Sequence, residues 1–142
     1  MLLTKRTESV ERHRGQIAFP GGSQEDDDES LYATALRETE EEIGVAPSDV
    51  RYLGALSPLT TVTGFYVEPY VVAIPCPYPF RLQESEIAGL IEVPIPALLD
   101  PAALETRPFP GRPEPVLFYH YGETVIWGAT AKMLKELLDS LR

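Results

Sequence analysis

Hydrophobic and polar positions along the chain follow two periods, one typical of strands and one typical of amphipathic helices. Apolar and β-branched residues recur with strand character in five segments and in one hairpin that turns near Gly122. These segments cover residues 2–7, 16–19, 50–59, 65–74 and 87–95, and the hairpin covers 116–127. Apolar residues at helical spacing predict two helices, over about Leu31–Ile43 and Ala129–Leu141. The pattern as a whole predicts an α+β fold, with a mixed sheet and helices packed on it.

Prolines and the last helix refine this prediction. Pro69 interrupts the segment 65–74, which predicts an edge strand or a bulge there. Prolines are dense over 75–79 and 94–115, which predicts long connections rather than domain boundaries. The last helix carries one apolar stripe, which predicts a core contact or a dimer interface. The stripe consists of Met133, Leu134, Leu137, Leu138 and Leu141.

The first expected helix carries an unusual cluster of carboxylates. Ser30 is a candidate N-cap, and Gly44 is a stop signal. Glu38, Glu41 and Glu42 fall within roughly 100° of one helix face, where like charges repel each other. They also lie in the C-terminal half, where the helix dipole disfavours negative charge. A solvated helix face is one interpretation. A site for a divalent cation such as Mg²⁺ or Mn²⁺, which carboxylates bind well, is the interpretation that we favour.

Composition limits the classes of function. The chain of 142 residues carries 12 Lys and Arg against 22 Asp and Glu, a formal charge of −10 that argues against binding to nucleic acid. The sequence has neither a membrane-spanning run nor a signal-peptide pattern, and its length suits one domain over 1–142. A single cysteine, Cys76, excludes an intramolecular disulfide and is expected to be buried or to fill an edge strand. We therefore expect a cytoplasmic protein with a small-molecule substrate and without nucleic-acid or membrane partners.

The glycine loop and the acidic helix together resemble the Nudix box, usually written G-x5-E-x7-R-E-U-x-E-E-x-G-U with U aliphatic. The matching residues are Glu29, Arg37, Glu38, Glu41, Glu42, Gly44 and Val45, preceded by Phe19, Pro20, Gly21 and Gly22. Six residues rather than five separate Gly22 from Glu29, and Thr39 replaces the usual aliphatic residue. The resemblance implies a Nudix fold, in which a mixed β-sheet packs between helices as an α/β/α sandwich. It also implies a metal-dependent hydrolysis of a nucleoside diphosphate that is linked to another group.

The same resemblance assigns roles to residues of the box. The metal ligands that it implies are Glu38, Glu41 and Glu42, and Glu38 and Glu42 are thereby catalytic candidates as well. A main-chain carbonyl near Gly21 is a further candidate ligand. The resemblance also implies that Arg37 pairs with Glu29, which would tie the start of the helix to its functional end. The choice between Mg²⁺ and Mn²⁺ and the number of ions stay open.

A second set of residues resembles the coenzyme A pyrophosphatase branch of the Nudix family. The matching segments are 2–7, 13–22 and, near the C-terminus, 126–131. The longer glycine loop is common in that branch, whereas Glu11 stands where many members carry arginine. The resemblance implies cleavage of CoA or acyl-CoA to 4′-phosphopantetheine and adenosine 3′,5′-bisphosphate. Two alternatives stay open: a hydrolase of ADP-ribose, NADH, a dinucleoside polyphosphate or a nucleoside triphosphate, and a non-catalytic Nudix-fold ligand sensor.

Other candidate residues have two interpretations each. Glu86 directly precedes the expected strand 87–95 and is our choice of general base, with a glutamate of the box as the alternative. The substrate-binding candidates are Arg6, His13, Gly21, Gly22 and Phe65. Basic residues before the glycine loop can offset the charge of a diphosphate, and His13 can contact a phosphate or be satisfied by backbone. Phe65 can stack on adenine or belong to the core.

The start of the chain raises a question about assembly. Nudix proteins usually have a strand before the one that corresponds to residues 2–4, so the resemblance implies a sheet that lacks this strand, a strand from a partner chain, or a trimmed start. An uncovered apolar edge favours association with another chain. A homodimer through this region is therefore our hypothesis.

Overall fold

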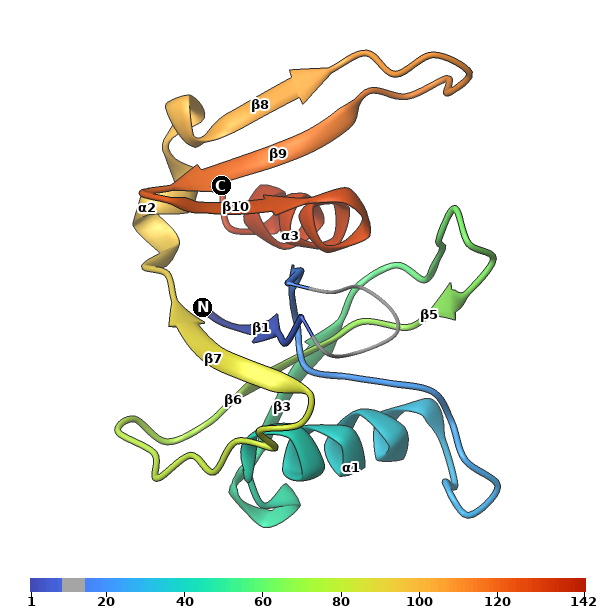
Figure 1. Ribbon diagram of the computed structural model, residues 1–142, viewed down its shortest axis with the longest axis vertical. Coiled ribbons are helices and arrows are strands. Elements are labelled where there is room, and N and C mark those ends of the chain that lie inside the picture. The colour runs from blue at the N-terminus through green and yellow to red at the C-terminus, as the bar shows by residue number, and fades with distance from the viewer. Residues whose placement is uncertain (9–14) are drawn as a thin grey trace.

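The computed structural model of the protein describes residues 1–8 and 15–142, and these residues form an α+β fold (Figure 1). The strands are β1 (Leu2–Arg6), β2 (Ile17–Ala18), β3 (Arg51–Ala55), β4 (Leu59–Thr60), β5 (Tyr66–Val67), β6 (Tyr70–Ala73), β7 (Ile87–Glu92), β8 (Leu104–Arg107), β9 (Val116–Tyr121) and β10 (Thr124–Trp127). The helices are α1 (Leu31–Ile43), α2 (Ile95–Leu99) and α3 (Gly128–Ser140), with 3-10 turns at Pro47–Asp49 and Pro101–Ala103. The predicted fold class is confirmed, and α1 has the predicted bounds.

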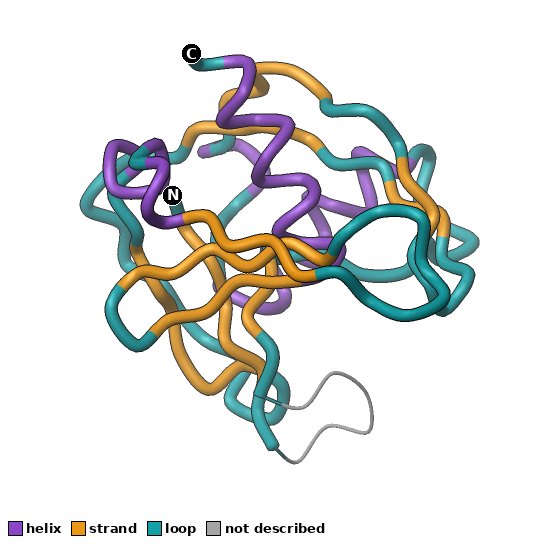
Figure 2. Tube along the Cα trace, turned by 90° about the horizontal axis from the view of Figure 1, so that it is seen from above, coloured by secondary structure: helices purple, strands orange, loops and turns teal. Residues whose placement is uncertain are grey.

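The described strands form four small sheets instead of one. Their strand orders are β2-β1-β7, β10-β9-β8, β3-β6 and β4-β5, and each pairing within them is antiparallel. Helices α1 and α3 lie on opposite sides of β1 (Figure 1). In the perpendicular view, α3 ends at the C-terminus on the upper rim of the molecule (Figure 2). This arrangement leaves the acidic helix α1 on the side away from α3.

The main core joins the two ends of the chain. Leu3 of β1 packs in one cluster with Leu98 of α2, Tyr119 of β9 and Ile126 of β10, and each of these side chains is at most 2% exposed. Ala131, Leu134 and Leu138 of α3 complete this cluster and are fully buried. Burial of such side chains contributes roughly 1.5–3 kcal/mol each for the larger ones. The N-terminal strand is therefore held against the C-terminal helix by a shared core.

The apolar stripe of α3 divides between two environments. Leu134 and Leu138 lie in the core, as predicted. Met133 and Leu137 are half-buried and face a large cavity, whereas Leu141 is 51% exposed. Only part of the stripe is thus core.

Strand β1 is the middle strand of its sheet. It pairs with β7 along its length, and Thr4 and Lys5 pair with Ala18 and Ile17 of β2. The expectation of an uncovered edge is therefore wrong at Thr4 and Lys5. The reason is that the chain returns through residues 17–18 and supplies a neighbour strand itself.

The proline-containing segments show two corrections. The segment 65–74, expected as one strand with an edge or a bulge at Pro69, instead forms two strands, β5 and β6, which lie in different sheets with Pro69 between them. The segment 94–115, expected as a long connection, instead contains α2 and β8. Helix α2 tolerates its prolines because they lie at its N-terminus, where the missing N–H has no helical partner. The four residues of β8 contain no proline and pair with β9.

Two further observations concern the cysteine and the length of the helices. Cys76 is exposed in the connection after β6, so the expectation of a buried or edge-strand cysteine is wrong. Within residues 1–8 and 15–142, no helix is both long and apolar enough to cross a membrane.

Candidate active site

Local sequence sets both ends of α1. The Oγ of Ser30 accepts a hydrogen bond from the Ala33 amide at 3.1 Å, which caps the helix. Gly44 ends the helix in the left-handed conformation, with φ 75°, and its amide donates to the Glu40 carbonyl at 2.9 Å. A side chain at Gly44 would also meet the backbone of Arg81. The predicted cap and stop are both confirmed.

Arg37 connects the glycine loop to α1. Its Nε and Nη2 donate to the two carboxylate oxygens of Asp28, each at 2.9 Å. Nη2 also donates to the Ser23 carbonyl at 3.0 Å, and Nη1 lies 3.1 Å from Glu38 and 3.2 Å from Glu41. The guanidinium holds the pKa of Asp28 well below its usual range. Arg37 therefore positions the loop and the acids, and each of its nitrogens is already engaged.

The acid that pairs with Arg37 is Asp28, so the expected pairing with Glu29 is wrong. The Asp28 side chain is 7% exposed and also accepts from the Glu25 amide and the Thr34 hydroxyl, both at 2.9 Å. These donors turn the carboxylate back toward the helix, whereas Glu29 is exposed. The sequence could have indicated this pairing, because five residues separate Gly22 from Asp28, the number that the Nudix box specifies between its glycine and its acid.

This correction predicts unequal effects of two neighbouring substitutions. Asp28→Asn should lower the Tm by several degrees, because Arg37 then loses a bidentate anionic partner and stays partly buried. Glu29→Gln, the matched control on an exposed side chain, should leave the Tm unchanged within a degree or so. Thermal unfolding followed by circular dichroism measures both. Equal losses in the two variants would contradict the assignment of Asp28.

Glu42 is the buried acid of the cluster. Its residue is 3% exposed. Burial raises the pKa of its carboxyl to about 7, and the negative charges of Glu38 and Glu86 add to this rise. The Gly21 amide, which donates a hydrogen bond to the carboxylate, and the guanidinium of Arg6 act in the opposite direction. A carboxylate is thus held in a position where its charge is poorly stabilised by the protein alone.

Glu38 lies against the glycine loop at Gly22 and near Glu42. Its side chain is 17% exposed, and burial raises the pKa of its carboxyl despite the nearby Arg37. The side chain also occupies the space beside Gly22, where a Cβ would lie 2.5 Å from Oε1 of Glu38. Gly22 is therefore needed for the close approach of this carboxylate to the loop. The two acids and the two glycines form one compact site.

Glu41 behaves differently from the other two predicted ligands. Its side chain is 51% exposed and interacts with Arg37. Within the described residues, no three His, Cys, Asp or Glu side chains already converge on one point as a metal site. The donor chemistry nevertheless fits a hard divalent cation, because Glu38 and Glu42 offer carboxylate oxygens whose mutual repulsion raises the pKa of Glu42. The structure thus brings two of the three predicted ligands together, whereas Glu41 is exposed and lies against Arg37.

The loop before β7 places Glu86 at this site. Its backbone closes the open end of α1: the Arg81 amide donates to the Ile43 carbonyl at 3.0 Å, and the Gln83 amide donates to the Glu42 carbonyl at 2.9 Å. Glu86 follows in a turn held by its own amide, which donates to the Gln83 carbonyl at 2.9 Å. Its charge contributes to the raised pKa of Glu42. The loop that we expected to supply an acid therefore lies beside the box.

The substrate-binding candidates divide into three groups. Arg6, at the end of β1, lies near enough to lower the pKa of Glu42, and its buried Nε has no hydrogen-bond partner among the described residues. Phe65 is 42% exposed beside β5, so its interpretation as a core residue is wrong. His13 lies outside the described residues.

Comparison with known protein families identifies relatives of this chain. The family model described as NUDIX domain matches residues 1–112, which include the glycine loop, α1 and Glu86. Proteins described as uncharacterized Nudix hydrolase NudL, from Yersinia pestis (strain Pestoides F) and Yersinia pseudotuberculosis serotype O:1b (strain IP 31758), are 39% identical over 143 residues. The alignment covers 99% of this chain and 72% of each relative.

Comparison with solved structures supports the fold. The chain is similar to the crystal structure of an Ap4A hydrolase binary complex from C. elegans, with a TM-score of 0.56 and 18% sequence identity. The superposition covers 67% of this chain and 68% of the other. At this level of identity the likeness concerns the fold alone.

Proposed function

We propose that this chain, which belongs to the Nudix family, hydrolyses the diphosphate of CoA or acyl-CoA in a metal-dependent reaction. The products would be 4′-phosphopantetheine, acylated where the substrate is acyl-CoA, and adenosine 3′,5′-bisphosphate. The observation that carries the proposal is the buried Glu42, held with Glu38 against the glycine loop and beside Glu86. Support for CoA in particular comes from the residues of segments 2–7 and 13–22, which resemble the CoA pyrophosphatase branch.

The reaction is a hydrolysis that needs no redox partner. The oxygen of a water molecule bonds to one phosphorus, the bond from that phosphorus to the bridging oxygen breaks, and the bridging oxygen leaves with the other phosphate. Mg²⁺ or Mn²⁺, held by Glu38, Glu41 and Glu42, would supply neutralisation of the diphosphate charge and activation of the water. Arg37 orients the acids by its contacts with Glu38, Glu41 and Asp28, and it is a positioning residue.

Glu86 is our proposed general base. Its loop is fixed to the end of α1 by backbone hydrogen bonds, so the carboxylate is held by a rigid element. A base in this position would take the proton of the attacking water, a role that typically contributes 10²–10⁴-fold to a rate.

Recognition of the substrate would involve the remaining candidates. Arg6 is a cation beside Glu42, and its Nε, which has no hydrogen-bond partner among residues 1–8 and 15–142, suits a phosphate oxygen. Gly21 and Gly22 let the backbone approach a phosphate closely. We further propose that His13 contacts a phosphate and that the exposed ring of Phe65 stacks on adenine.

The proposal also covers the domain boundaries, the cellular location and the oligomeric state of the protein. We propose that residues 1–142 act as one domain, because Leu3 shares a core with Leu134 and Leu138, which lie beyond the matched residues 1–112. We also propose a cytoplasmic location, for which the single exposed Cys76 is the support. We also propose a homodimer, with its contact elsewhere than the edge of β1 at Thr4 and Lys5, because β2 covers that edge.

A substrate panel tests the proposed activity. CoA, ADP-ribose, NADH and diadenosine polyphosphates are incubated with the protein and either Mg²⁺ or Mn²⁺, and the products are separated by chromatography. We expect kcat/KM for CoA to exceed that for each other compound at least ten-fold. Cleavage of a diadenosine polyphosphate or ADP-ribose with CoA left intact would contradict the CoA assignment. Binding without any cleavage would indicate a ligand sensor instead.

A further inference from the structure

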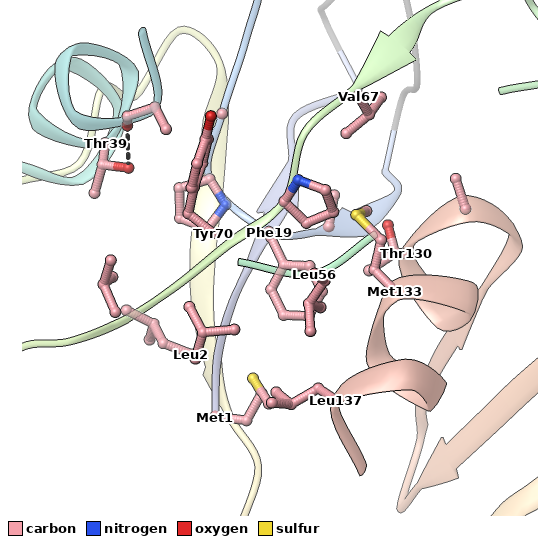
Figure 3. A pocket seen from close by; sticks show the side chains of 18 of the residues that line it. Met1, Leu2, Phe19, Thr39, Leu56, Val67, Tyr70, Thr130, Met133 and Leu137 are labelled. Carbon is pink, nitrogen blue, oxygen red and sulfur yellow. Dashed lines mark hydrogen bonds between the residues drawn. The ribbon is translucent and has the colours of Figure 1, made fainter. Parts of the chain in front are cut away.

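The N-terminus of α3 borders a large cavity that lies between α1 and α3 (Figure 3). The volume of this cavity is about 1,700 Å³. Gly21 and Gly22 of the glycine loop line it. Gly128, Thr130 and Lys132, from the first turns of α3, line it as well. Strand β10, which leads into α3, lies against β2, which leads into the glycine loop. The start of α3 and the candidate active site therefore share one cavity.

The backbone at the start of α3 presents hydrogen-bond donors to this cavity. The first amides of a helix have no acceptor within the helix, and the aligned peptide dipoles place partial positive charge there. Ser, Thr, Asp or Asn commonly caps such amides, but the N-cap residue of α3 is Trp127, whose side chain makes no capping hydrogen bond. The first turn also carries no acidic residue. This end of α3 therefore attracts an anion.

Thr130 adds a polar group that is buried at the same place. The residue is 9% exposed, and its hydroxyl makes no hydrogen bond to the residues in 1–8 and 15–142. A buried hydroxyl without a partner costs free energy, and such groups are rare in folded proteins. Thr130 and Met133 lie on the face of α3 that borders the cavity (Figure 3). The hydroxyl can therefore donate to a ligand that enters the cavity at this point.

Lys132 supplies a full positive charge at this end of the helix. Its side chain is 61% exposed, and its ammonium lies 3.2 Å from the carboxylate of Glu114, which is 74% exposed. An exposed ion pair of this kind is weak, so the ammonium can exchange Glu114 for a stronger anion. Backbone amides, a hydroxyl and an ammonium are donors that bind phosphate. A phosphate monoester, with three acceptor oxygens and a charge of about −1.5 to −2 at pH 7, suits this set of donors.

We propose that the N-terminus of α3 binds a phosphate monoester through its first backbone amides, the Thr130 hydroxyl and the Lys132 ammonium. This anion site is distinct from the carboxylates of α1, which need a cation, and it does not depend on the proposed function. Two sources of the bound group fit the chemistry: free phosphate, and a phosphate of the substrate outside its diphosphate. The second source rests on the proposed function, in which the nucleotide arm of CoA carries a 3′-phosphate.

Binding in EDTA tests the site without catalysis. The amide resonances of ¹⁵N-labelled protein are followed by NMR while inorganic phosphate, adenosine 3′,5′-bisphosphate or AMP is added. We expect the resonances of Gly128, Ala129 and Thr130 to shift along a saturable curve with phosphate and with the bisphosphate. An absence of saturable shifts at these amides with all three compounds would overturn the inference.

The same titrations distinguish the two sources of the phosphate. Half-saturation by the bisphosphate at a concentration at least ten-fold below those of phosphate and AMP would support the nucleotide arm of the substrate as the source. Half-saturation by phosphate at the same concentration as the bisphosphate, or at a lower one, would support free phosphate. Both results support an anion site at α3.

Two lysine substitutions test the position of the anion. Lys132→Gln should raise the half-saturating phosphate concentration at least five-fold, because the ammonium is lost from the site. Lys135→Gln is the matched control on the same helix, since Lys135 pairs with Asp139 at 2.6 Å and does not line the cavity. It should change that concentration less than two-fold. Equal weakening in the two variants would indicate a general effect of charge and contradict the placement of the phosphate.

Thr130→Val distinguishes a hydroxyl that binds a ligand from one that supports the fold. Valine keeps the shape of the side chain and removes a buried hydroxyl without a partner among the described residues, so the Tm without phosphate should stay equal or rise. Phosphate binding should weaken at least three-fold. Thr124→Val is the control, since Thr124 on β10 does not line the cavity, and it should keep parental binding. A lower Tm of Thr130→Val together with parental phosphate binding would assign the hydroxyl a structural role instead.

Cleavage of CoA in Mg²⁺ separates failure of this inference from failure of the proposed function. If the protein cleaves CoA but the α3 amides respond to none of the three compounds, the anion site is wrong and the proposed function stands. If the α3 amides respond saturably but CoA stays intact, the proposed function is wrong and the anion site stands.

Discussion

Glu42→Gln is expected to lower kcat for CoA at least 10³-fold, which corresponds to about 4 kcal/mol of transition-state stabilisation. The amide keeps the shape of the side chain but removes the charge that we assign to metal binding. The metal-free variant should be at least as stable as the parent. The reason is that the substitution removes a carboxylate which is 3% exposed and whose pKa is raised to about 7 by burial. Loss of activity without loss of stability separates a functional acid from a structural one.

Glu40→Gln is the matched control for this experiment. Glu40 lies on the same helix, is exposed, and is no part of the proposed ligand set. Its substitution should leave kcat and KM within about two-fold of the parent. Steady-state kinetics in Mg²⁺ and thermal unfolding in EDTA compare the three proteins. Near-parental activity of Glu42→Gln would show that the assignment of this ligand is wrong.

Gly22→Ala is expected to lower kcat/KM about 10²-fold with little change in Tm. The added methyl group would occupy the space of the Glu38 carboxylate, which must then move away from the loop. This carboxylate is the end of a flexible side chain, so the cost in stability is small. A displacement of about 1 Å at a reacting site can nevertheless cost 10²-fold in rate.

Gly21→Ala provides the comparison within the same loop. A Cβ at Gly21 meets no atom within 4 Å, and the backbone of neither glycine is in the left-handed region. Gly21→Ala adds a methyl group beside the proposed phosphate but does not displace Glu38, so its loss in kcat/KM should be at least several-fold smaller than that of Gly22→Ala. The two alanine variants are compared by kinetics and by thermal unfolding. If both lose activity equally, crowding of Glu38 is not the cause.

Local signals explain why α1 was predicted with its bounds. Ser30 and Gly44 act on hydrogen bonds within four residues of themselves, so their effect can be read from the sequence. The hairpin of β9 and β10 was predicted for the same reason, with Gly122 at its turn in the left-handed conformation. The sequence therefore predicts well those elements whose ends are set by hydrogen bonds between residues close in sequence.

Side-chain orientation and strand pairing explain the errors. The choice of Asp28 over Glu29 depends on which carboxylate turns toward Arg37, and that is decided by donors from Glu25 and Thr34. Strand β8 was not predicted within the segment 94–115, because it is stabilised by pairing with β9, which lies later in the chain. Periodicity within a segment carries no information about either contact.

The site was predicted as a set of residues but not as a geometry. The sequence pointed to Glu38, Glu42 and Glu86 through the Nudix box and the position before a strand. It did not show that backbone amides of Arg81 and Gln83 hold the Glu86 loop against α1. The large cavity was also missed, since the apolar stripe of α3 looks the same whether it faces a core or an opening.

The central claim is that the acids of α1 act together with a divalent cation to cleave a diphosphate. The most direct measurement is phosphorus NMR of CoA incubated with metal-free protein, first in EDTA and then after addition of excess Mg²⁺. We predict that the diphosphate signals persist in EDTA and are replaced by two phosphomonoester signals after Mg²⁺ is added. Persistence of the diphosphate after addition of either Mg²⁺ or Mn²⁺, with folded protein, would contradict the account.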